Sequence, residues 1–354
     1  SAMAGGMGWG IRGQYGHETG AMIAGVLVSL ILVFLFCPNN NSIQVVRAAA
    51  LGTIAMGFGG SMTYGQTVGL THDAPLIGNW SSLCWGMIGL AMKGGVWIGF
   101  FGFFFGLGLG GKRYRPVEIL LLCTSMLTVL VIGWLVFNTP HDPENKKLPL
   151  LYFSDHWKWE PGVQLKHRPE IWGGLWSALI LGVTYAVLAK KDIMARNLAF
   201  WGIIGGALGF PIGQTLQATN AWNPEFFRQS FIGPFTQKFN WWNIMETTFG
   251  TVMGATVGLG LWLNRSRIRI SSQPNISSLS RWAVFGLLCL HLCLLTLVDF
   301  GRFSWADGIY DLGLMMGLIP LVASVSSLWW PYLQLLPITL LPIAGKTLRM
   351  LVYS

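Results

Sequence analysis

The chain has 354 residues, of which 53% are hydrophobic and only 10% are charged, with a formal net charge of +9. A soluble domain carries about 25% charged residues, so these values exclude an ordinary soluble enzyme and indicate an integral membrane protein. Its basic residues form short clusters between apolar runs, a distribution typical of a membrane topology signal rather than of a nucleic-acid groove. No nucleic-acid partner is therefore expected.

Apolar runs recur along the whole chain, and a bilayer span takes about 20 such residues. The first element, the Gly-rich residues 3–16, is too short to span and is predicted to be a half-helix or an extension of the first span. The helices predicted after it cover residues 20–36, 43–68, 80–110, 117–137, 171–189, 196–218, 241–263, 281–299, 309–328 and a Pro-interrupted segment over 331–346. This pattern predicts an all-α polytopic membrane protein, with about ten transmembrane helices in a single transmembrane domain over residues 1–354.

Three basic clusters suggest the orientation of the chain. GKRYR at 111–115, KKDIMAR at 190–196 and NRSRIRIS at 264–271 fall on one side if the intervening helices alternate in direction. Positively charged loops stay in the cytoplasm, so this side is predicted to be cytoplasmic in a bacterial inner membrane. The long loop 138–170 is then periplasmic, and residues 300–354 hold the C-terminal helices.

An internal repeat is visible in the sequence. RAAALGTIAMGFGGSMTYGQT at 47–67 aligns with RNLAFWGIIGGALGFPIGQT at 196–215, and the helices that follow, 92–113 and 245–265, also correspond. The offset of about 149 residues separates two groups of four helices, so the alignment predicts a parallel pseudo-repeat of 20–137 and 171–299. Many transporters are built from internal repeats and bind their solute at the repeat interface.

A third copy of the glycine–glutamine pattern stands at the start of the chain, in GWGIRGQYGHE. At an offset of 52, Gly5, Gly8, Gly13 and Gln14 match Gly57, Gly60, Gly65 and Gln66. We expect the polar residues of these elements to meet near the outer face of the membrane, just before the first helix turns inward.

Two charged residues, Lys93 and Glu246, fall at matching places in the two long helices of the repeat. Counting 1.5 Å per residue places each roughly 27–29 Å from the cytoplasmic end of its helix, close to the outer boundary. Glycines spaced by four give both helices a smooth stripe. If the stripes pack together, Lys93 and Glu246 can pair. A structural ion pair and a solute or proton site both remain open.

The candidate substrate-binding residues share a predicted position at the outer mouth. They are Arg12, Gln14, His17, Glu18, Gln66, His72, Asp73, Lys93, Gln214 and Glu246. Amides suit neutral or hydroxylated solutes, whereas an arginine beside exposed backbone amides suits an anion. Interhelical hydrogen bonding is the competing interpretation for the amides, as headgroup contact is for Arg12.

A metal site is the weaker interpretation of the His–Glu and His–Asp pairs, because adjacent residues do not share a helix face and no HExxH pattern occurs. The sequence holds no P-loop, Rossmann, haem or GxSxG pattern, so no cofactor is indicated.

These features predict a secondary transporter for a small polar or anionic solute, such as a sugar, polyol or organic acid. Its pocket would face the periplasm at the repeat interface. The alternative is a membrane-embedded enzyme that acts at the periplasmic boundary on a lipid-linked or saccharide substrate, with His17 or His72 as the base and Glu18 or Asp73 as its partner. Besides the lipid bilayer and the solute, a coupling proton or cation and an oligomeric state remain open.

Overall fold

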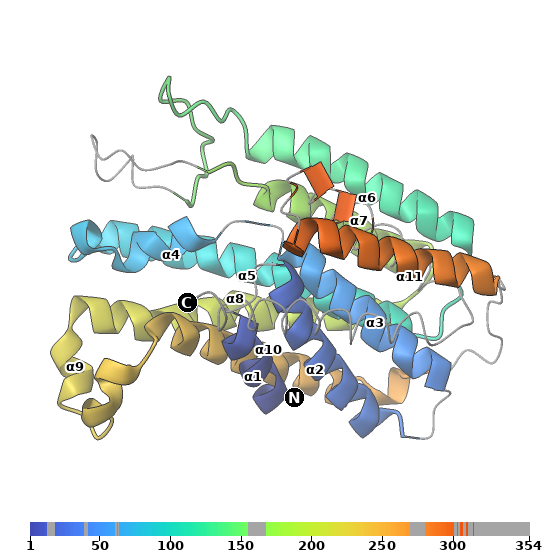
Figure 1. Cartoon of the computed structure of the whole chain (residues 1–354), viewed down its shortest axis with the longest axis horizontal. Coiled ribbons are helices and arrows are strands. Elements are labelled where there is room, and N and C mark those ends of the chain that lie inside the picture. Colours follow the sequence, from blue (N-terminus) through green and yellow to red (C-terminus); the bar gives the residue numbers. More distant parts are fainter. Residues whose placement is uncertain are drawn as a thin grey trace.

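The computed structural model describes residues 1–12, 18–38, 42–60, 62, 64–154, 168–269, 280–300, 303, 305–306, 309–310 and 314. Within these ranges every regular element is a helix, and no sheet is formed (Figure 1). The all-α class predicted from the sequence is therefore confirmed for the described part of the chain. The last two predicted helices, 309–328 and 331–346, lie almost wholly outside that part.

Most predicted helices reappear within two residues of their expected bounds, and α8 extends the predicted 196–218 at both ends. The α-helices are α1 Ala2–Arg12, α2 Glu18–Phe36, α3 Ser42–Gly59, α4 Gly65–His72, α5 Trp80–Leu109, α6 Pro116–Phe137, α7 Trp172–Leu188, α8 Ile193–Trp222, α9 Pro224–Arg228, α10 Trp241–Leu263 and α11 Arg281–Leu295. A π-helical turn, Thr296–Phe300, continues α11. The Gly-rich start forms the separate short helix α1, not an extension of α2.

Side-chain caps explain where several of these helices begin. Asn79 accepts a hydrogen bond from the Ser82 backbone N–H before α5, and Asp192 accepts one from Ala195 before α8. Asn240 caps α10 and Ser280 caps α11 in the same way. Such residues satisfy backbone donors that a helix start leaves unpaired, and they therefore fix the residue at which each helix begins.

Four helical segments are long and apolar enough to cross a membrane, namely Trp80–Leu109, Val117–Phe137, Ile193–Trp222 and Arg281–Val298. Gly20–Phe36 and Trp172–Leu188 are shorter apolar helices. At 1.5 Å per residue, the 30 residues of α5 and of α8 are each about 45 Å long, which exceeds a hydrocarbon core of about 30 Å. Both helices are thus longer than a span requires.

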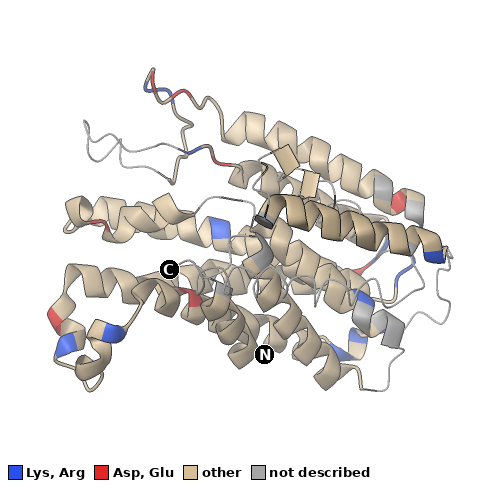
Figure 2. Cartoon of the chain, in the orientation of Figure 1, with Lys and Arg blue, Asp and Glu red and all other residues tan. Residues whose placement is uncertain are grey.

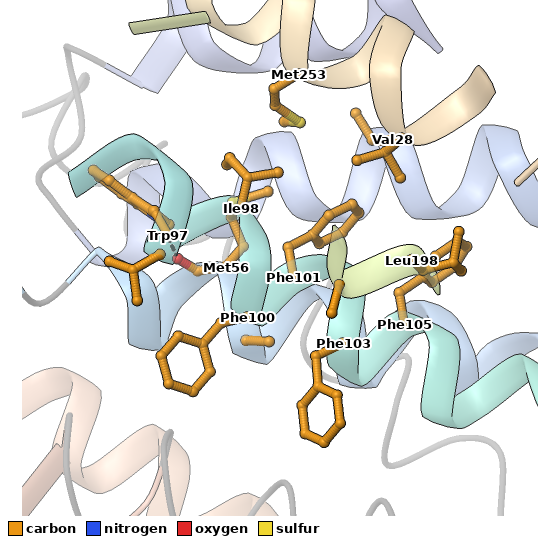
Figure 3. Close-up of a cluster of buried hydrophobic side chains, with 14 of the residues drawn as sticks. Val28, Met56, Trp97, Ile98, Phe100, Phe101, Phe103, Phe105, Leu198 and Met253 are labelled. Carbon is orange, nitrogen blue, oxygen red and sulfur yellow. Dashed lines mark hydrogen bonds between the residues drawn. The ribbon is translucent and has the colours of Figure 1, made fainter. Parts of the chain in front are cut away.

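Helix α5 runs through the centre of the bundle, where it packs against α3, α4 and α8 (Figure 1). Helix α8 also packs along α10, and α10 in turn packs against α1. The buried side chains on α5 are large and aromatic, among them Trp97, Phe101 and Phe105 (Figure 3). The Trp97 indole N–H donates to the Met56 carbonyl at 2.7 Å, which ties α5 to α3.

Backbone-to-backbone contact fixes which helices are neighbours. A Cβ atom on Gly94 of α5 would overlap the backbone of Gly206 on α8, and the reverse also holds. Gly250 of α10 and Gly5 of α1 approach each other in the same way. The predicted packing of the α5 glycine stripe on the α10 stripe is therefore not formed. The α5 stripe packs against α8, and the α10 stripe packs against α1.

The helix predicted over 43–68 is also wrong, because α3 and α4 are separate helices. Helix α3 ends at Gly59, Gly60 lies in a turn, and Tyr64 has a non-helical conformation with φ −132° and ψ −14° before α4 begins at Gly65. Glycine disfavours a helix by up to about 1 kcal/mol relative to alanine. The Trp97 indole fills the space beside Gly59. The apolar pattern continues through this junction, so hydropathy alone did not reveal the break.

The three basic clusters gather at one end of the bundle, as the sequence predicted (Figure 2). There the Tyr114 hydroxyl donates to Asp192 at 3.0 Å, and the Arg269 backbone N–H donates to the Leu109 carbonyl at 3.1 Å. Burial raises the pKa of the Asp192 carboxyl, and burial together with that carboxyl raises the pKa of the Tyr114 phenol. We call this the basic end, and the opposite end, which holds α4 and α9, the α4 end.

Candidate functional site

Lys93 pairs with Glu170, not with Glu246. Its ammonium nitrogen lies 2.6 Å from Glu170 Oε1, and the two side chains are 1% and 0% exposed. The same nitrogen donates to Thr67 Oγ1 at 2.8 Å and to Ser154 Oγ at 2.7 Å. An ammonium has three donors, and here all three have acceptors. This arrangement satisfies a charge that is costly to leave unpaired inside a membrane protein.

Glu170 and Ser154 belong to the long loop 138–170, which the sequence predicted to be periplasmic and which was not expected to contact Lys93. Instead, its two described ends turn inward: the Ser154 hydroxyl donates to Glu170 Oε1, and the Phe153 backbone N–H donates to Glu170 Oε2 at 3.0 Å. Both polar residues were missed because neither lies in an apolar run. The signal that could have revealed Glu170 is its position, since it is a carboxylate two residues before α7 begins at Trp172.

Glu246 has a different environment, at the junction of α3 and α4. Its Oε1 accepts hydrogen bonds from the Tyr64 hydroxyl at 2.8 Å and from the Trp242 indole N–H at 3.0 Å. Tyr64 immediately precedes α4, so this carboxylate anchors the short helix to α10. Tyr64 and Trp242 were not among the predicted site residues.

A cluster of aromatic rings packs against Tyr64. Phe210 and Phe249 stack with centroids 4.2 Å apart, and Trp9 makes edge contacts with Trp97 and Phe249 at 4.9 and 4.6 Å. Tyr64 lies 5.2 Å from Phe210. The rings come from α1, α5, α8 and α10, so the centre of the bundle below the α3–α4 junction is a packed aromatic plug rather than an open path.

Two glutamines of α8 contact the last turn of α4. The Gln214 amide donates to Thr71 Oγ1 at 2.7 Å, and the Gln217 amide nitrogen lies 3.3 Å from His72 Nε2. Residues three apart on a helix share a face, so the two carboxamides are neighbours. Trp222 adds a third link, since its indole N–H donates to the Thr71 carbonyl at 2.8 Å. Gln217 and Thr71 were not predicted as site residues.

Both glutamines keep a buried oxygen without a partner. Gln214 is fully buried and Gln217 is 7% exposed, yet in the described part of the chain neither carboxamide oxygen accepts a hydrogen bond. A buried polar atom left unsatisfied costs about 1–3 kcal/mol. Two such acceptors on one helix face mark a place where two hydrogen-bond donors are missing among the described residues.

His72 is engaged at both ring nitrogens. Its Nδ1 lies 2.9 Å from the Val68 carbonyl, which can only accept, so Nδ1 carries the proton and Nε2 accepts from Gln217. Asp73 Oδ1 is 3.8 Å from Nδ1, beyond hydrogen-bond distance. This geometry disfavours His72 as a general base, because no ring nitrogen is open to a substrate.

The remaining predicted residues are Gln66 in α4 and four residues near the start of the chain. Gln66 lies in the first turn of α4 and is half-buried. Arg12 ends α1 and Glu18 begins α2, but their side chains, together with residues Gln14 and His17, lie outside the described residues. Among the described residues, no group of three His, Cys, Asp or Glu side chains is placed to hold a metal ion.

The polar contacts of this region therefore meet on α4 and on Tyr64 just before it: side chains of α4 contact α5, α8 and the loop ends, and Tyr64 contacts α10. Comparison with known proteins adds no relative: no family model matches the chain, and no curated protein or solved structure matches it significantly.

Proposed function

We propose that the protein is a secondary transporter for a small, neutral, hydroxylated solute, a sugar or polyol, which binds between α4 and α8. One observation carries the proposal: the buried carboxamide oxygens of Gln214 and Gln217 lack donors in the described part of the chain. A hydroxyl group would satisfy each of them. An organic acid would bring further acceptors to the same place, so the neutral members of the predicted solute class are favoured.

The broken helix supports transport over catalysis. In transporters, solute sites are commonly built from discontinuous membrane helices, whose unwound backbone lines the site. The α3–α4 junction is such a break. At the corresponding place in α8 stands Pro211, which has no backbone N–H to donate to the Ala207 carbonyl and therefore weakens the helix there.

Similar packing in the two halves supports the proposed parallel repeat of 20–137 and 171–299. Gly59 of α3 packs against Trp97 of α5, and Gly209 of α8 packs against Phe249 of α10. In this proposal the chain forms about ten spans in a bacterial inner membrane, with the basic end in the cytoplasm. The solute site then opens to the periplasm, and the aromatic plug closes it on the inner side.

Glu246 is the group we assign to a coupling proton. As a carboxylate it accepts strong, charge-assisted hydrogen bonds from Tyr64 and Trp242. Protonation weakens both bonds and loosens the start of α4, the helix that covers the solute site. Release of α4 would open the site as one half of the repeat moves against the other.

A thermal-shift panel of sugars, polyols and organic acids on the purified protein tests the proposal. A solute that binds only the folded state raises the melting temperature, by an amount that grows with its concentration above Kd. We expect a shift with a neutral hydroxylated solute that Gln214→Leu abolishes, whereas the exposed Gln229→Ala control keeps it.

Any solute identified in this way is then assayed for uptake into proteoliposomes with and without a pH gradient. Accumulation supports transport, and its loss in Glu246→Gln supports proton coupling. Chemical conversion of the solute without accumulation would instead establish the membrane-enzyme alternative. No shift with any hydroxylated solute, or shifts that Gln214→Leu leaves unchanged, would overturn the proposed site.

A further inference from the structure

A groove lies along the first turns of α8, at the basic end of the bundle and far from the solute site. Its volume is about 370 Å³, and it is lined by Arg196, Asn197, Phe200 and Trp201. Arg196 is the fourth residue of α8 and Trp201 the ninth. The groove therefore starts at the polar end of the helix and runs about 8 Å towards its apolar middle, at 1.5 Å per residue.

The arginine of this groove is held in place by a chain of amides. Arg196 donates through Nε and Nη2 to Asn197 Oδ1 at 3.0 and 2.9 Å. Asn197 donates in turn to Asn264 Oδ1 at 2.6 Å, and Asn264 donates to the Gly260 carbonyl at 2.8 Å. The guanidinium has five N–H donors, and two of its nitrogens, Nε and Nη2, donate to Asn197. The others are available to an anion in the groove.

The inner part of the groove is aromatic. Trp201 lies against Gly260 of α10, where a Cβ atom would overlap its ring, so the indole bridges the α8–α10 seam. Phe200 is 58% exposed beside it. An arginine at the polar end followed by exposed aromatic rings suits an amphiphile, whose charged group can contact the arginine while its apolar part contacts the rings. A soluble anion would contact the arginine alone.

From these features we infer that the groove binds the headgroup of an anionic phospholipid, with its phosphate on Arg196 and the start of its acyl chains along Phe200 and Trp201. The surrounding charge agrees with such an occupant, since the three basic clusters share this end of the bundle (Figure 2). Juxtamembrane basic residues attract anionic lipids. A volume of about 370 Å³ holds a headgroup, while the chains lie outside along the helix. This inference is independent of the proposed transport.

Native mass spectrometry of the detergent-purified protein with equal amounts of phosphatidylglycerol and phosphatidylcholine tests the inference. We expect retention of phosphatidylglycerol in preference to phosphatidylcholine, and about fivefold less of it in Arg196→Gln. The matched control is Arg228→Gln, an exposed arginine at the α4 end that pairs with Glu225 at 2.7 Å. It should bind the lipid as the unchanged protein does.

Phe200→Ala is the second variant, because its exposed ring can be removed without a cavity, and we expect it to weaken lipid retention as well. Equal retention in Arg196→Gln and in the unchanged protein would overturn the inference. If Arg196→Gln does not fold, retention that is unchanged in Phe200→Ala would overturn it instead. Displacement of the lipid by millimolar inorganic phosphate would assign the groove to a soluble anion and also reject a lipid site.

Discussion

Two buried polar clusters contact α4, one at Thr67 and the other at Thr71 and His72, and they differ in one respect. Around Lys93, the ammonium has three acceptors, and both oxygens of Glu170 have donors. Around Gln214 and Gln217, each amide nitrogen has a partner, but each amide oxygen lacks one among the described residues. A fully satisfied cluster holds a structure together, whereas we propose that the incomplete one receives its missing donors from the solute. Lys93 and Glu170 are thus part of the scaffold, and the neutral amides form the candidate site.

The largest effect is expected from breaking the satisfied cluster. Lys93→Met leaves Glu170 buried and without its cation, which should lower the free energy of unfolding by about 3–5 kcal/mol. Thermal unfolding in detergent measures the loss. Adding Glu170→Gln to Lys93→Met should recover most of it, because no uncompensated charge remains. Recovery by exchanging Lys93 with Glu246 instead would contradict the observed pairing.

An intermediate effect is expected at the α3–α4 junction. Tyr64→Phe removes one hydrogen bond to the Glu246 carboxylate and should lower the free energy of unfolding by about 1.5–3 kcal/mol. The ring contacts of Tyr64 remain, so the loss reports the hydroxyl alone. Thr256→Val, which removes a hydroxyl that bonds only to its own helix, is the control. Equal losses in the two variants would mean that Glu246 does not hold α4.

The smallest effect on stability is expected at the incomplete cluster. Gln214→Leu removes an unsatisfied oxygen together with the donor to Thr71, so the two contributions offset each other. We expect the melting temperature without ligand to stay within a few degrees or to rise, while solute binding is lost. A fall as large as that of Lys93→Met would show that Gln214 is a structural residue, which would remove the contrast between the two clusters.

The sequence identified the central polar residues of these clusters but not their partners. Lys93, Gln214 and Glu246 were identified as exceptional because each is a polar residue within an apolar run. Their partners were not identified. Glu170 lies outside the apolar runs, and Tyr64 was hidden by the apolar pattern that continues across the α3–α4 junction. Alignment of the repeat suggested Glu246 as the partner of Lys93, but alignment reports equivalence and not contact.

Hydropathy, capping residues and local charge were enough to predict an all-α chain with helices that could cross a membrane, the bounds of most helices and the gathering of basic residues at one end. The three-dimensional structure was needed to show that α3 and α4 are separate, that Gly94 meets Gly206, and that Lys93 binds Glu170. Those outcomes depend on which backbone surfaces can approach closely in three dimensions, and on a loop that folds inward to satisfy a buried charge. Periodicity along the chain contains neither kind of information.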